Sequence, residues 1–148
     1  QSLPNTGFEE DGGGGAPKGW QAVGSGKAAW VGDVVKTGKK AVSVSDAGQG
    51  DFSGWAAEIE VQPETSYCFH GNVKGGALKP YGYVGGGALC IRFLDKDGQP
   101  LGREVVSRAA GPQSGWTYVR TASAVPPAGA KYARFIVGMQ FCGGDCAV

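Results

Sequence analysis

The chain has 148 residues, 28 glycines and a net charge of +1, which suits one glycine-rich globular domain. The near-neutral charge argues against a protein that binds nucleic acid or a charged membrane surface. No apolar run approaches the roughly 20 residues that a membrane helix needs. The glycines follow no G-X-Y period, which excludes collagen, and apolar runs between Gly, Pro, Asp and Ser clusters predict an all-β sandwich.

The first half of the chain predicts short strands between turn-rich loops. We expect a first strand within 5–10, a clear strand within 36–45 and another within 55–67, where Pro63 ends the pairing. Alternation at period two assigns each side chain to one face of its strand. The residues expected to face the core are Phe8, Val42, Val44, Trp55, Ile59 and Val61, and those expected to face outward are Ser43, Ser45, Glu58 and Glu60.

The two central strands are expected at 66–74 and 87–95. Their apolar residues share one parity in each strand and are Tyr67, Phe69, Val73, Leu89, Ile91 and Phe93. The opposite parity holds Cys68, His70, Asn72, Lys74, Cys90 and Arg92. If the strands pair antiparallel with Cys68 opposite Cys90, the Cβ atoms lie about 4.5–5.5 Å apart, close to the spacing of a disulfide. We therefore predict a Cys68–Cys90 bridge within a polar working face.

The second half predicts a hairpin and two further strands. An Asp97-Gly98 turn leads into 102–108, and strands follow at 115–127 and 132–141. In the last of these, Ala133, Phe135 and Val137 share the inward phase. Trp116 opens its strand and is expected in the core, whereas Trp30 cannot be phased.

The four cysteines also bear on the compartment. Cys142 and Cys146 enclose a Gly-Gly-Asp loop and could form a second bridge. Zinc is the competing interpretation, but this spacing with a single histidine lacks four convincing ligands. Two disulfides indicate an oxidising compartment. No signal peptide is apparent and Gln1 directly precedes a motif typical of a domain start, so we expect an excised or mature domain.

A series of short motifs runs through almost the whole chain. It comprises Asn5-Thr6-Gly7-Phe8-Glu9, Gly19-Trp20, GKKAVSV at 38–44, PETSY at 63–67, LCIRFLD at 89–95 followed by Asp97-Gly98, Trp116, and the strand at 132–137. In this order the motifs resemble the β-jelly-roll carbohydrate-binding modules grouped around families 4, 9, 16 and 22. The resemblance implies a two-sheet antiparallel β-sandwich, the jelly roll, that binds sugar on its concave face or at its rim loops.

The same resemblance implies a structural calcium ion. Its ligands would be Glu9 of the Gly-Phe-Glu motif, the carbonyl of Lys39 in the Gly-Lys turn, and a late aspartate for which Asp145 stands here. Calcium takes six to eight oxygens, and carbonyls of glycine-rich turns can supply several. Relatives usually carry an Asp-Asp pair in their last strand, whereas this chain ends in GGDCAV at 143–148. Either Asp145 takes the role of that aspartate, or the last strand lies beyond these residues.

Sugar binding calls for aromatic rings and planar polar groups. The apolar face of a pyranose covers an aromatic ring, and its hydroxyls take hydrogen bonds from amides, carboxylates and basic side chains. The residues expected to bind the ligand are Trp20, Gln21, His70, Asn72, Lys74, Tyr81, Tyr83 and Arg92. Lys74 and Arg92, reinforced by Arg103, Arg108, Arg120 and Arg134, suit a uronic or sulfated polysaccharide, but a neutral glycan stays open.

Two enzyme interpretations are weaker. Glu58 and Glu60 lie about 6.5–7 Å apart along one strand face, near the spacing of inverting glycosidases. Such carboxylates are, however, common on solvated faces. The single histidine, His70, could pair with Tyr81 or Tyr83 for lyase chemistry, but no spacing supports this. No nucleophile elbow or phosphate loop is present.

The sequence therefore predicts a non-catalytic carbohydrate-binding module spanning 1–148. We expect a secreted or periplasmic monomer that binds a polysaccharide and directs a covalently linked carbohydrate-active enzyme to it. The main alternative is a structural or docking jelly roll without a sugar site, which burial of Trp20, Trp30 and Trp55 would favour. A small lyase or glycosidase is the third.

Overall fold

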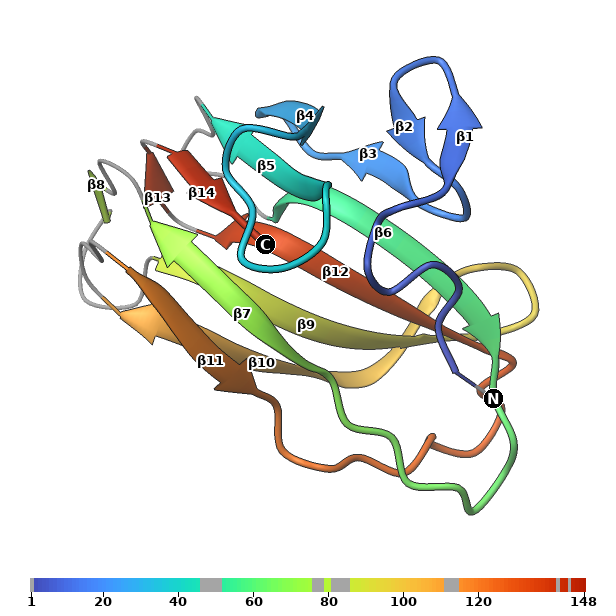
Figure 1. Cartoon of the computed structure of the whole chain (residues 1–148). Helices are drawn as coiled ribbons and strands as arrows, with labels where there is room; N and C mark the ends of the chain where they lie inside the picture. Colours follow the sequence, from blue (N-terminus) through green and yellow to red (C-terminus); the bar gives the residue numbers. More distant parts are fainter. Residues whose placement is uncertain are drawn as a thin grey trace.

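The computed structural model describes residues 2–45, 52–75, 79–80, 86–110, 115–140, 142–143 and 145–148, with only the backbone described at 79–80, 86, 110, 142–143 and 145. Two five-stranded antiparallel sheets lie face to face and enclose the main core (Figure 1). This arrangement confirms the predicted all-β, two-sheet jelly roll. No helix formed by the described residues is long and apolar enough to cross a membrane.

One sheet, here named the β9 sheet, holds the longest strands. Its order is β10 (Pro100–Ala110), β9 (Gly86–Leu94), β12 (Tyr132–Gln140), β6 (Ser53–Glu60) and β3 (Gln21–Val23). Neighbouring strands far apart in sequence, such as β9 and β12, pair along their whole lengths.

The second sheet, here named the β7 sheet, carries the candidate site. Its order is β11 (Trp116–Arg120), β7 (His70–Gly75), β14 (Asp145–Ala147), β5 (Ala41–Ser45) and β4 (Lys27–Val31). Two short ribbons complete the described strands, and they pair β1 (Asp11–Gly13) with β2 (Ala16–Pro17) and β8 (Lys79–Pro80) with β13 (Cys142–Gly143).

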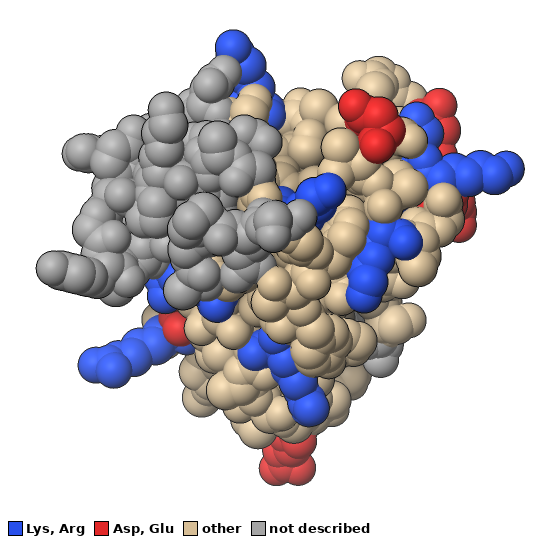
Figure 2. Space-filling view, turned by 60° about the vertical axis from the view of Figure 1, so that its left-hand side comes forward, with Lys and Arg blue, Asp and Glu red and all other residues tan. Residues whose placement is uncertain are grey.

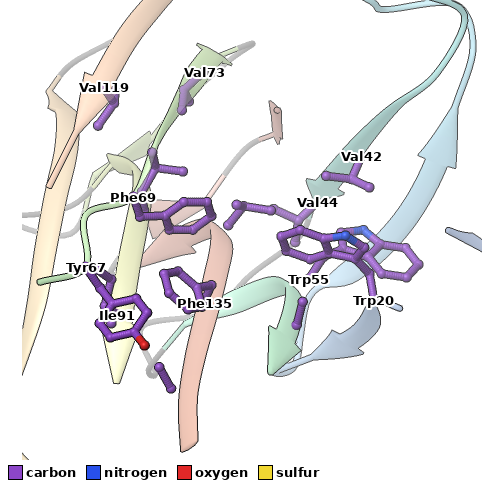
Figure 3. Close-up of a cluster of buried hydrophobic side chains, with 14 of the residues drawn as sticks. Trp20, Val42, Val44, Trp55, Tyr67, Phe69, Val73, Ile91, Val119 and Phe135 are labelled. Carbon is purple, nitrogen blue, oxygen red and sulfur yellow. The ribbon is translucent and has the colours of Figure 1, made fainter. Parts of the chain in front are cut away.

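The core confirms the inward phases that alternation predicts. Aromatic and branched side chains from both sheets meet between them, and Phe69 and Phe135 touch edge to face at 5.2 Å (Figure 3). Glu58 and Glu60 are exposed on β6, as expected. The predicted core residues that lie in this cluster are Phe8, Val42, Val44, Trp55, Ile59, Val61, Tyr67, Phe69, Val73, Leu89, Ile91, Phe93, Ala133, Phe135 and Val137.

The predicted pairing of the two central strands is wrong. β7 pairs with β11 and β14, whereas β9 pairs with β10 and β12 in the other sheet. The two strands face each other across the core, where Val73 and Leu89 are both fully buried. Parity was correctly predicted because it is local, but β7 and β9 belong to different sheets of this sandwich.

The predicted Cys68–Cys90 disulfide is therefore wrong as well. Cys68 is a free thiol next to β7, with its Sγ atom 3.7 Å from Nη2 of Arg120. Cys90 lies in β9 within a small apolar cluster away from the main core, and its Sγ is 3.7 Å from a carboxylate oxygen of Glu104. The second predicted bridge involves Cys142, whose side chain lies outside the described residues. No disulfide is present among the side chains that the structure describes.

The predicted hairpin after 87–95 is confirmed and contains an irregularity. Asp95 closes the turn, because its side chain accepts hydrogen bonds from the backbone N–H groups of Asp97 and Gln99, each at 2.8 Å. β10 then runs antiparallel to β9 as an edge strand. Its register shifts between Leu101 and Val105, which is the mark of a β-bulge.

Two glycines face each other where β6 and β12 pair. Gly54 and Gly138 are directly opposite, with φ of +155° and +154°. A Cβ atom on Gly138 would clash with the carbonyl oxygen of Ser53, and one on Gly54 would clash with that of Val137. The close pairing of these strands therefore requires glycine at both positions.

Gly138→Ala should lower the free energy of unfolding by roughly 2–4 kcal/mol, because it adds both backbone strain and overlap. Urea denaturation followed by tryptophan fluorescence measures the change. Gly115→Ala is the matched control, since a Cβ there meets nothing within 4 Å. A loss below about 0.5 kcal/mol for Gly138→Ala, within the range of ordinary surface changes, would contradict this account.

Candidate functional site

Three of the four tryptophans serve the scaffold. Trp20 is only 6% exposed, packs edge to face on Phe8 at 5.1 Å, and donates its indole N–H to the carbonyl of Pro4 at 3.1 Å. Trp55 donates to Ser43 and half-buried Trp30 donates to Phe8. The ring thus holds the N-terminal segment against the core, and it also lines the cleft described below, so the ligand-binding role of Trp20 stays a prediction.

The outer face of the β7 sheet brings polar and aromatic residues together. Val73 and Val119 point into the core, so their neighbours along β7 and β11 must point outward. The register places the outward residues in three direct cross-strand pairs, which are Lys74 with Trp116, Asn72 with Tyr118 and His70 with Arg120. We name these six residues the β7–β11 platform.

Trp116 and Tyr118 make this platform aromatic. Trp116 is half-buried and not in the core, contrary to the prediction, because it shares the outward parity of Tyr118 and Arg120. Tyr118 is 59% exposed, unusual for so large a ring. Its centroid lies 5.8 Å from the imidazole of His70 with the planes tilted by 38°. The exposed rings of Tyr118 and His70, with half-buried Trp116 on the same face, form a surface on which the apolar face of a sugar can pack.

Sequence reasoning missed Tyr118, although the signal was present. In the run WTYVR at 116–120, aromatic and basic residues alternate with Thr117 and Val119. Assigning Val119 to the core would have turned Trp116, Tyr118 and Arg120 outward together.

Polar contacts place further hydrogen-bonding groups beside the rings. Lys36, in the loop between β4 and β5, donates from Nζ to Oδ1 of Asn72 at 2.8 Å. The amide of Asn72 and the ammonium of Lys36 therefore stand together at the edge of the platform. Arg120 holds its guanidinium next to the thiol of Cys68 at 3.7 Å. These groups can donate to hydroxyl or acidic oxygens of a ligand.

Two predicted ligand residues lie on the opposite surface of the molecule. Arg92 belongs to β9 and donates from Nε to a carboxylate oxygen of Glu104 at 2.6 Å. Gln21 belongs to β3, at the edge of the same sheet. Neither Arg92 nor Gln21 can therefore contact the same ligand as His70, Asn72 and Lys74. The prediction that all five residues form one site is wrong. Tyr81 and Tyr83 lie outside the described residues and stay predictions.

A cleft of about 440 Å³ opens next to the platform. Its walls come from the N-terminal segment, the 36–41 loop and β7, and its floor contains core side chains such as Leu89 and Phe135. It lies beside the end of β14, which pairs with β7 only at Gly75 and Lys74. Residues 70–72 of β7 have no strand paired with them on the side of β14, among the residues that the structure describes, and they border the cleft there.

Two of the three predicted calcium ligands, Glu9 and Lys39, come together, but in another role. Oε1 of Glu9 accepts hydrogen bonds from the backbone N–H groups of Lys39 at 2.8 Å and Lys40 at 3.1 Å. Asp145 pairs with Ser45, at the far end of β5 from Lys40, about 16 Å away at roughly 3.3 Å per residue. The three residues thus do not fit around one ion in this arrangement, and a calcium ion stays an untested prediction. The described residues contain no cluster of three or more acidic, His or Cys side chains.

The carboxylates considered for catalysis are used as ion-pair partners. Glu58 binds Arg134 at 2.5 Å and Glu60 binds Lys131 at 3.2 Å. Both pairs lie on the outer surface of the β9 sheet, away from the cleft. His70 packs against Tyr118, and the tyrosines predicted as its partners lie outside the described residues. Among the residues that the structure describes, Glu58, Glu60 and His70 share no site for acid–base chemistry, because the two glutamates and the histidine lie on different sheets.

Comparison with solved structures supports the jelly-roll fold. The CBM22-1 xylan-binding domain from Paenibacillus barcinonensis Xyn10C matches with a TM-score of 0.66 and 16% identity, over 95% of this chain and 85% of that one. A family 16 carbohydrate-binding module matches with a TM-score of 0.57 and 18% identity, over 81% and 79%. The fold is therefore that of the family 16 and 22 modules, as the sequence motifs implied.

The fold also occurs within much larger proteins. The enzymatically active domain of tailspike protein 4 from bacteriophage CBA120 matches with a TM-score of 0.63 and 15% identity over 87% of this chain, which spans only 18% of that domain. No protein-family model matches the chain, and no curated protein matches it in sequence.

Glu9→Gln should lower the free energy of unfolding by about 1–2 kcal/mol. The substitution replaces the charged carboxylate oxygen that accepts two backbone hydrogen bonds with a neutral amide oxygen, which is a weaker acceptor. Thermal melting with added calcium and with chelator measures the effect. If Glu9 only holds the loop at Lys39 and Lys40, the variant's melting temperature falls by the same amount with calcium and with chelator. A melting temperature of the native protein that rises with calcium, with the rise abolished by Glu9→Gln, would instead establish a metal ligand.

Proposed function

We propose that this protein is a non-catalytic carbohydrate-binding module that holds a polysaccharide along the outer face of the β7 sheet. The observation that carries the proposal is the exposed Tyr118 ring next to His70, on a sheet face lined with hydrogen-bonding groups. The fold shared with xylan-binding and other carbohydrate-binding modules supports it.

The mechanism is stacking combined with hydrogen bonding. A pyranose ring covers Tyr118 or Trp116 with its apolar face, while Asn72 and Lys74 reach its hydroxyl groups. The backbone of β7 and β11 is fixed by five cross-strand pairs, so the face is preformed and little conformational entropy is lost on binding. The open face suits an extended polymer better than the adjoining cleft, whose floor is the apolar core.

A module of this kind acts together with an enzyme domain to which it is linked. Tethering an enzyme to a domain that binds the same polymer raises the local concentration of its substrate. We infer that such an enzyme is covalently linked to this module. We also infer that the module acts as a monomer outside the cytoplasm, where its polysaccharide substrate would be found. The carbohydrate-binding modules that share the fold support the inference.

Tyr118→Ala should weaken polysaccharide binding about tenfold. A sugar that covers one face of the ring gains about 1–1.5 kcal/mol of binding free energy at roughly 25 cal/mol per Å² of buried apolar area, and the variant loses this gain. Affinity electrophoresis against a panel of soluble polysaccharides identifies a ligand, and isothermal titration calorimetry measures the change. Tyr118→Trp should keep the affinity, because it keeps a stacking surface.

Gln21→Ala is the control, because Gln21 is exposed on the β3 strand of the other sheet. Equal losses for Tyr118→Ala and Gln21→Ala would place the ligand elsewhere. Retention by none of the panel would favour the structural or docking jelly roll, which the burial of Trp20 and Trp55 already suits. A fall in polymer viscosity during incubation would revive an enzymatic function.

A further inference from the structure

The two sheets differ in how they arrange charge on their outer faces. The β9 sheet carries both signs in close pairs, which are Arg92 with Glu104 at 2.6 Å, Arg134 with Glu58 at 2.5 Å and Lys131 with Glu60 at 3.2 Å. Arg108 of the same sheet instead contacts the side-chain amide of Gln140, and Arg103 is exposed in the β10 bulge. Three of the basic groups on this surface are therefore already paired with carboxylates of the protein.

Among the side chains that the structure describes, the strands of the β7 sheet carry basic groups and no acidic one; the side chain of Asp145 in β14 lies outside the description. Its strands contribute Lys27, Lys74 and Arg120, together with His70, and Lys36 is added by the loop before β5. No side chain that the structure describes on these five strands is acidic. In Figure 2, Lys and Arg side chains are spread over the described surface, while the Asp and Glu side chains in view lie towards its margins.

The basic groups flank the aromatic platform. Lys74 is paired directly with Trp116, and Arg120 is paired directly with His70 at the other end of β7. Positions 70 and 74 lie about 13 Å apart along the strand at roughly 3.3 Å per residue. A polymer stacked on Tyr118 would thus have a cation near each end of its stacked segment.

We propose that the polysaccharide bound by the β7 sheet is anionic, carrying carboxylate or sulfate groups that pair with Lys74, Arg120 and Lys36. The inference rests on the proposed function and names the class of ligand for the same face. The chemistry of these groups fits either anion, since both offer oxygens to ammonium and guanidinium donors.

The small extent of the basic surface distinguishes this arrangement from a nucleic-acid surface. The whole chain has a net charge of only +1. The excess of basic groups is local and lies beside rings that suit sugar stacking. In contrast, general binding of nucleic acid needs a basic surface that extends along many phosphates.

The test compares two polymers that differ only in charge, low-ester homogalacturonan and the same polymer fully methyl-esterified. We expect the acidic form to bind at least about tenfold tighter, the sum of several exposed ion pairs. That preference should fade between about 0.1 M and 1 M salt, as the screening length falls from about 10 Å to about 3 Å. A sulfated galactan, a neutral arabinoxylan and a single-stranded oligonucleotide complete the panel, and comparison of the first with homogalacturonan distinguishes sulfate from carboxylate.

Variants locate the effect on the molecule. Lys74→Gln and Arg120→Gln should each weaken binding of the acidic polymer about threefold more than they weaken binding of a neutral one. Lys96→Gln is the control, since Lys96 lies in the exposed turn between β9 and β10. Thermal melting of each variant confirms that it is folded.

The outcomes separate the two proposals. Neutral and acidic polymers bound equally well, with loss on Tyr118→Ala, would overturn the anionic ligand and leave the carbohydrate-binding module standing. Failure to bind any polysaccharide would overturn both. Binding of the oligonucleotide as tight as that of the acidic polymers would also overturn the inference, because it would reflect charge without sugar recognition.

Discussion

The platform depends on the burial of Val73 and Val119 between the two sheets. Because side chains alternate along a strand, burying Val73 leaves Asn72 and Lys74 no position except the outer face. Across the core, Gly87 of β9 leaves room for that valine, since a Cβ on Gly87 would lie 2.6 Å from its Cγ1 atom. A slip of one residue in β7 would exchange the two faces and remove the platform.

The N-terminal segment and the 32–40 loop are fixed by groups that could otherwise serve a ligand. The indoles of Trp20 and Trp30 hold the segment through its carbonyl groups, and Glu9 ties it to the loop through two N–H groups. The loop then reaches β7 through Lys36 and Asn72. A continuous set of contacts thus runs from the start of the chain to the edge of the platform.

Sequence patterns predicted which side chains face the core better than they predicted which strands pair. Alternation in β5, β6, β7 and β9 correctly assigned the inward residues, because periodicity is a property of each strand alone. Pairing β7 with β9 failed because pairing is a long-range choice, and with it failed the Cys68–Cys90 bridge and the placing of Arg92 beside His70. Trp116 faces outward although it was expected in the core, since ring size alone does not tell a buried aromatic residue from an exposed one. Of the predicted site, His70, Asn72 and Lys74 do share one face.

The bulge in β10 bears on how such modules behave when crowded. A polymer with many binding sites gathers copies of a domain at high local density, where exposed sheet edges can pair with one another. β10 is a long edge strand, but its register breaks between Leu101 and Val105, and Arg103 and Glu104 stand exposed within that break. A bent, charged edge is a poor template for another strand. The bulge therefore disfavours edge-to-edge pairing of copies, including copies crowded on a polymer if the proposed binding holds.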